Sequence, residues 1–176
     1  MRWKTHKKEC LFEGRFVTIE KHIVDRGDGN HYDFEFIHYN NEAVGIIPFN
    51  EDKGEILLVK QYRYFAGDFF WEIPAGGIDS GESAVTSATR ELIEETGYAA
   101  KIQHYFDFYP SVGGTDQLFH IFLATNPQKL KKKADPLEIL ELSWFSYATI
   151  KEMILTTKIR DGLTLGALAR FFLEYV

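Results

Sequence analysis

The sequence predicts an α/β sandwich with a mixed sheet, preceded by a small antiparallel β-sheet subdomain. Strand patterns outnumber helical patterns, and one helical segment interrupts the run of strands. The chain has 176 residues and an apolar content of 45%, which is enough for one compact core with a small appendage. We therefore expect an N-terminal β-strand subdomain over residues 1–42 and a main domain over residues 43–176.

The first half of the chain contains most of the expected strands. Residues 15–24 and 31–39 alternate apolar and polar side chains, and the sequence DRGDGN between them is typical of a turn. The runs AVGIIPF at 43–49 and GEILLVKQYR at 54–63 are almost continuously apolar. Such runs indicate strands that are covered on both faces. The segment WEIPAGG at 71–77 is expected to be a strand that leads into a glycine loop.

The second half contains the expected helices. Residues 83–96 have a helical pattern, and Gly97 stands where helices commonly end. Two strands are expected at 101–110 and 118–126, followed by a polar loop at 127–138 and a strand, ILELSWFS, at 139–146. Helices at 148–157 and 164–175 are expected to close the chain.

Charge and cysteine content narrow the function classes. The net charge is -6, which disfavours a nucleic-acid partner, because phosphate backbones need clustered Lys and Arg. The single cysteine, Cys10, has no partner for an internal disulfide, so we expect a reducing compartment, the cytoplasm. The N-terminal residues have no apolar signal core, and no stretch approaches ~18 apolar residues, so neither export nor a membrane span is expected.

Three glutamates crowd one side of the helix at 83–96. At about 100° per residue, Glu91, Glu94 and Glu95 fall within an arc of roughly 100°. They also lie in the last turn, where the helix dipole disfavours negative charge. A solvated acidic surface is the alternative, but Mg²⁺ or Mn²⁺ would remove the repulsion. The apolar side chains of the adjoining arc should face the core: Val85, Ala88 and Leu92.

The surroundings of the helix favour the metal interpretation. Gly76 and Gly77 precede it, where backbone carbonyls can approach a metal without obstruction. Arg90 can orient carboxylates through forked hydrogen bonds. Gly76, Glu82 and the run RELIEETGY at 90–98 resemble the Nudix box at each of its defining positions, and the order of strands and helices resembles the α/β/α sandwich of that family.

The resemblance to Nudix hydrolases implies a function and a set of roles. These enzymes hydrolyse a nucleoside diphosphate linked to another group, with two or three Mg²⁺ or Mn²⁺ ions per site. By the family pattern, Glu91 and Glu95 should bind metal directly, and Glu94 should bind metal or hold a metal-bound water. The carbonyl of Ala75 should complete a site. Arg90 would orient the acids, and Glu82 would stay outside the ligand set.

The wider sequence is similar to the ADP-ribose pyrophosphatase branch of the family. LLVKQYRYF at 57–65 resembles the strand that carries a substrate-binding arginine there, here Arg63 beside Tyr62. SVGGTDQ at 111–117 resembles a substrate loop, with Gly113 and Gly114 at its centre. The resemblance thus implies hydrolysis of ADP-ribose to AMP and ribose 5-phosphate.

Two positions depart from this branch and leave the substrate open. Val112 replaces its usual proline, and Gln117 stands where an acid is frequent. GDP-mannose or other nucleotide sugars are therefore alternative substrates. A nucleotide-binding module that does not cleave its ligand is a rival from another class, but the complete set of glutamates argues against it.

The resemblance also implies where the general base lies and that the protein forms a dimer. The base should be a glutamate on a loop after the box, and Glu138 and Glu141 are the candidates. Glu138 is favoured, because it ends the loop, whereas Glu141 lies within a strand pattern. A small sheet with exposed edges needs covering, so a homodimer is expected, and the resemblance implies that the N-terminal strands help to build the partner's site.

Overall fold

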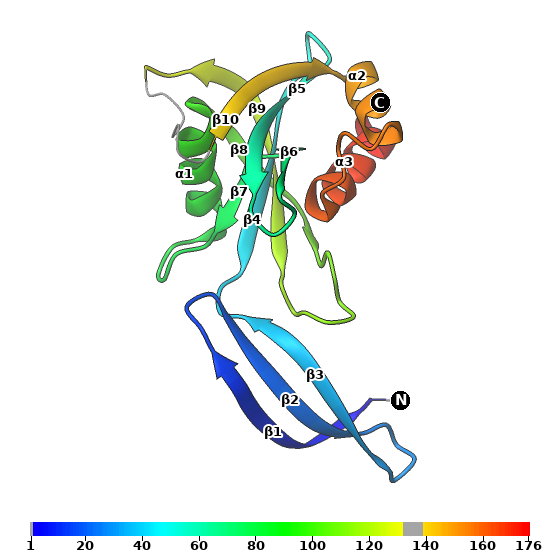
Figure 1. The fold of residues 1–176 in the computed structure, drawn as a ribbon. Coiled ribbons are helices and arrows are strands. Elements are labelled where there is room, and N and C mark those ends of the chain that lie inside the picture. The colour runs from blue at the N-terminus through cyan, green and yellow to red at the C-terminus, as the bar shows by residue number, and fades with distance from the viewer. Residues whose placement is uncertain (1, 132–138) are drawn as a thin grey trace.

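A computed structural model describes residues 2–131 and 139–176. In chain order its elements are β1 (Lys4–Glu13), β2 (Val17–Asp25), β3 (His31–Tyr39), β4 (Ala43–Asn50), β5 (Glu55–Arg63), β6 (Asp68–Glu72), β7 (Ala75–Gly77), α1 (Ala84–Thr96), β8 (Tyr98–Phe108), β9 (Phe119–Lys129), β10 (Ile139–Ser146), α2 (Tyr147–Leu155) and α3 (Gly162–Tyr175). Helix α1 covers one face of the main sheet, and α2 and α3 cover the other, which confirms the predicted α/β/α sandwich (Figure 1).

The main sheet is mixed, as predicted. Within the described residues its strands follow the order β10-β5-β4-β9-β8, and β6 pairs with β5 while β7 pairs with β4. Strands β4 and β9 are parallel, and the other pairs are antiparallel. Strand β7 lies directly before α1 in the chain, so its pairing with β4 fixes the glycine loop against the centre of the sheet.

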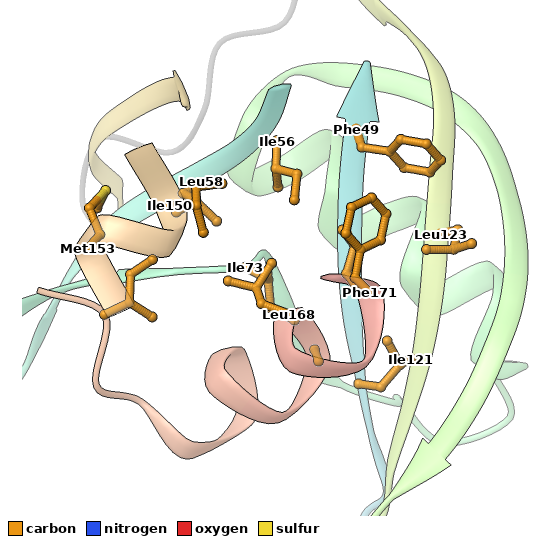
Figure 2. Close-up of a cluster of buried hydrophobic side chains, with 13 residues drawn as sticks. Phe49, Ile56, Leu58, Ile73, Ile121, Leu123, Ile150, Met153, Leu168 and Phe171 are labelled. Atoms are coloured by element: carbon orange, nitrogen blue, oxygen red, sulfur yellow. The ribbon is translucent and has the colours of Figure 1, made fainter. Parts of the chain in front are cut away.

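The core lies on both faces of this sheet. On the side of α2 and α3, Phe49 of β4 packs edge-on against Phe171, with ring centroids 5.1 Å apart (Figure 2). On the side of α1, Val44 and Ile46 pack with Ala88 and Leu92. Alternate residues of β4 thus supply both cores, which explains its continuous apolar run.

Helix α1 begins and ends as the sequence indicates. The side chain of Ser83 accepts a hydrogen bond from the Thr86 amide, and Gly97 ends the helix with a φ of 67°. One prediction for this helix is wrong, because Val85 is 48% exposed. On the helix Val85 lies at an angle between the buried Leu92 and Thr96, so its exposure follows from its place in the first turn and not from the direction of its side chain.

Strands β1, β2 and β3 form a separate antiparallel sheet at one end of the sandwich (Figure 1). The Ile37 amide of β3 donates to the Gly114 carbonyl at 2.9 Å, and the Asp116 carboxylate accepts from the Tyr39 amide at 2.9 Å. Every residue of β1 is exposed. The division at residues 42 and 43 stays a prediction. Among the described helices, none is both long and apolar enough to cross a membrane.

Candidate active site

Arg90 joins three acidic side chains, two on α1 and one just before it, into one network. Its guanidinium donates to Glu82 at 3.0 and 3.2 Å, to Glu91 at 2.7 Å and to Glu94 at 3.4 Å. It also donates to the Gly77 carbonyl at 3.0 Å, which ties the helix to the glycine loop. The hydrogen bond that Arg90 donates to Glu82, together with those to the other acids, raises the pKa of Arg90 above its usual value. The carboxylates therefore converge despite their repulsion.

Glu95 is the most deeply buried of the three helix glutamates, with 5% of its surface exposed. Its carboxylate accepts from the Gln61 side chain at 2.7 Å and from the Ala75 amide at 3.0 Å. Burial raises the pKa of Glu95 to about 8, although these two donors oppose the rise. A cation beside the carboxylate would favour its ionised form.

A small hollow of about 430 Å³ separates these acids from β5 and β7. Its lining residues are Gln61, Tyr62, Arg63, Ala75, Gly76, Glu91 and Glu95. Gly76 provides the space for Glu91, because a Cβ at position 76 would lie 2.0 Å from Glu91 Oε1. Carboxylate oxygens around such a space are the hard donors that Mg²⁺ and Mn²⁺ prefer. The residues thus fit a divalent cation.

A large cavity of about 1160 Å³ is continuous with the small hollow, since Arg63, Gly76 and Glu91 line both. Its walls come from segments far apart in the sequence. The aromatic side chains on its wall are Phe16, Tyr39, Tyr62, Tyr64, Phe65, Phe70 and Phe119. The cavity therefore combines an acidic end with a broad aromatic surface.

Arg63 borders both spaces and is held by a buried acid. Its guanidinium donates to the Glu72 carboxylate from Nε at 2.9 and 3.1 Å and also from a terminal nitrogen. The Glu72 side chain is only 5% exposed, whereas that of Arg63 is 50% exposed. This hydrogen bond raises the pKa of Arg63. Glu72 thus fixes the direction of a cation that faces the small hollow.

Replacing Arg63 tests whether this cation contacts the substrate. Arg63→Ala should raise KM for a nucleotide sugar more than it lowers kcat, because the anionic substrate loses a charged partner. Glu72→Gln should raise KM by a smaller factor, since the guanidinium stays but loses its fixed orientation. Steady-state kinetics on both variants measures the two effects.

A surface pair on α3 provides the matched control. Arg170 donates to Glu174 at 2.9 Å, and its side chain is 46% exposed. Arg170→Ala should leave KM unchanged. An unchanged KM for Arg63→Ala would remove Arg63 from the substrate contacts.

The other predicted substrate contacts fall in different places. Tyr62 lines both the small hollow and the large cavity and is 52% exposed. Gly113 and Gly114 are absent from the described lining of both spaces, although Ser111 and Gln117 of the same loop line the large cavity. The Gly114 carbonyl instead accepts from β3, so this part of the loop holds the N-terminal sheet.

Of the two candidate bases, only Glu141 lies within the described residues. Glu138 lies outside the described residues. Glu141 lies on β10 opposite Lys60, with 3.5 Å between the Lys60 Nζ and a Glu141 oxygen. Successive residues of a strand point to opposite faces, and Gln61, next to Lys60, reaches Glu95. Glu141 therefore lies across the sheet from the α1 glutamates.

Sequence reasoning missed Gln61 and Glu72, which position Glu95 and Arg63. A signal for both was present. Each is a polar residue within a strand that is otherwise largely apolar, and each is buried, at 8% and 4% exposed. A buried polar side chain needs a partner, so such a residue beside a predicted site is a candidate for orienting it.

A family comparison identifies the family of the chain. The model of the NUDIX domain matches residues 40–163, which include β4, the glycine loop and α1. The chain belongs to the Nudix hydrolase family. The predicted family and enzyme class are confirmed.

Curated relatives and a solved structure match most of the chain. An ADP-ribose pyrophosphatase from Bacillus subtilis is 32% identical over 168 residues, covering 94% of this chain and 90% of that protein. A GDP-mannose pyrophosphatase from Shigella flexneri is 31% identical, covering 86% and 77%. The crystal structure of an ADP compounds hydrolase aligns with a TM-score of 0.84 at 20% identity, covering 99% of this chain and 95% of that one, which confirms the fold.

Proposed function

We propose that this Nudix hydrolase cleaves the pyrophosphate bond of a nucleoside diphosphate sugar, with ADP-ribose the leading substrate and AMP and ribose 5-phosphate the products. One observation carries the proposal: Glu91, Glu95 and Arg63 line one small hollow that opens into the large cavity. A diphosphate bridging cations and Arg63 would occupy that space.

In this proposal the chain's own residues bind and orient. Glu91, Glu95 and the Ala75 carbonyl would hold two or three Mg²⁺ or Mn²⁺ ions, and Glu94 would bind a metal or hold a metal-bound water. Bound divalent cations supply charge neutralisation at the phosphates and lower the pKa of a water molecule. Arg90 keeps the acids converged, and Arg63 neutralises the diphosphate. Exposed aromatic faces on the large cavity offer stacking to a nucleobase.

The substrate is tested by hydrolysis of a nucleotide-sugar panel that includes ADP-ribose and GDP-mannose. The similarity to an ADP-ribose pyrophosphatase over 94% of the chain supports ADP-ribose. GDP-mannose is the second candidate, because Gln117, which lines the large cavity, stands where the ADP-ribose branch frequently has an acid. Faster turnover of GDP-mannose would replace the leading substrate, and no turnover of any panel member with Mg²⁺ would contradict the proposed activity.

For the general base we propose Glu138. Glu141 faces Lys60 on the other side of the sheet from Glu95, which favours the earlier glutamate. Glu138→Gln should lower kcat by about 10²–10⁴-fold, the usual contribution of a general base. Glu141→Gln is the matched control and should change kcat little. Single-turnover kinetics measures both, and the reverse pattern would move the base to Glu141.

We also propose that the chain acts as a homodimer in the cytoplasm, with residues 1–42 as its dimerisation subdomain. The exposed aromatic side chains near the N-terminal sheet support this: Phe12 is 55%, Phe16 68%, Tyr64 79% and Phe65 101% exposed. Strand β1 is an exposed edge that a second copy would cover. Sedimentation velocity tests the assembly, and a monomer at all concentrations would contradict it.

A further inference from the structure

A second group of metal-binding side chains lies on β8 and β9. The nearest oxygen of Asp107 is 2.8 Å from His104 Nε2 and 2.8 Å from His120 Nδ1. The other ring nitrogen of His120 lies 2.9 Å from a carboxylate oxygen of Glu42, just before β4. One ligand atom each of His104, Asp107 and His120 lie within 4.8 Å of one another. Three separate segments therefore bring two imidazoles and two carboxylates together.

An irregularity in β8 is what creates this group. In a regular strand, residues three apart point to opposite faces, so His104 and Asp107 would be separated. Here His104 pairs with Phe122 and Asp107 pairs with His120, with a register shift between them. The extra residue of this β-bulge turns both side chains to one face, that of His120. Bulges that re-aim side chains are over-represented next to active sites.

The two carboxylate contacts of His120 require a positive charge on its ring or beside it. Both of its ring nitrogens face carboxylate oxygens, on Asp107 and Glu42. A neutral imidazole has only one N–H to donate, so one contact needs either a second proton or a metal ion. Imidazole together with carboxylate is a ligand set for Zn²⁺ and similar transition metals, whereas Mg²⁺ prefers oxygen alone.

We propose that His104, Asp107 and His120 form a binding site for a divalent transition-metal ion, Zn²⁺ in the first instance, separate from the glutamates of α1. At Zn–N and Zn–O distances of about 2.0–2.2 Å, ligands of a tetrahedral ion stand about 3.4 Å apart. The His104–Asp107 contact of 2.8 Å is shorter than that value, and the 4.8 Å within which all three ligand atoms lie is longer. The side chains of His104 and Asp107 are 51% and 50% exposed, so small rotations can reach it.

Calorimetric titration of the untagged protein with Zn²⁺ tests this site, with excess Mg²⁺ present to compete at the α1 glutamates. The wild type should bind one ion tightly. His104→Ala and His120→Ala should each weaken that binding by more than about 10-fold, the least effect of losing even an outer partner of a metal site. Unchanged Zn²⁺ binding by His104→Ala would overturn the proposal.

Two controls separate this site from other ligands in the chain. Glu95→Gln should keep the tight Zn²⁺ binding, and its loss there would assign the ion to the α1 glutamates instead. His6 and His31 form another imidazole pair, with ring centroids 4.4 Å apart. His6→Ala should leave Zn²⁺ binding unchanged, and a loss would overturn the assignment. His104→Ala should retain turnover with Mg²⁺, so the result is independent of the proposed function.

Discussion

Glu95→Gln should abolish turnover while the protein still unfolds cooperatively. The substitution keeps the shape of the side chain but replaces one carboxylate oxygen by a donor. Two donors, Gln61 and the Ala75 amide, already point at this carboxylate at 2.7 and 3.0 Å, so an amide NH₂ group placed there would face another donor. We expect kcat/KM to fall by at least about 10²-fold, more than the loss of an outer partner of a metal site.

Kinetics and calorimetry together measure this effect. Mg²⁺ or Mn²⁺ uptake in the presence of a non-hydrolysable nucleotide sugar should weaken in parallel with turnover. Glu152→Gln on α2 provides the control, because Glu152 is an exposed helical glutamate on the other face of the sheet. Turnover near wild type for Glu95→Gln would contradict its assignment as a ligand.

Much of the fold follows from local patterns. Strand β10 occupies 139–146 and β3 occupies 31–39, as predicted, because alternation and flanking turns delimit them. Helix α1 was predicted within one residue, since Ser83 and Gly97 are strong end signals. Strand β1 had no such pattern. It is exposed along its whole length, so no buried face imposes alternation on its sequence.

Contacts between residues far apart in the sequence could not be predicted from local patterns. The helical spacing places Glu95 beside the buried face. How deeply its carboxylate is buried depends on Gln61 of β5, which lies 34 positions earlier. The pairing of Arg63 with Glu72 depends on the antiparallel register of β5 and β6. The imidazole cluster on β8 and β9 depends on a bulge. Each contact requires knowledge of which strands pair and at what register.

A single methyl group added to the glycine loop should also lower activity strongly. Gly76→Ala should lower kcat/KM by about 10²-fold, the scale of a displacement of about 1 Å at a reacting centre. The new Cβ would lie 2.0 Å from Glu91 Oε1 and 2.2 Å from its Cδ. The carboxylate must rotate away, and it then leaves both Arg90 and the small hollow.

The neighbouring glycine separates this effect from loop rigidity. A Cβ at Gly77 meets no heavy atom of the described chain within 4 Å, and the backbone there has no positive φ, so Gly77→Ala should keep turnover and stability. Because only the end of a side chain is displaced in Gly76→Ala, its melting temperature should change little while activity falls. Equal activity in the two variants would show that the position of Glu91 does not limit the reaction, and would remove this carboxylate from the proposed metal ligands.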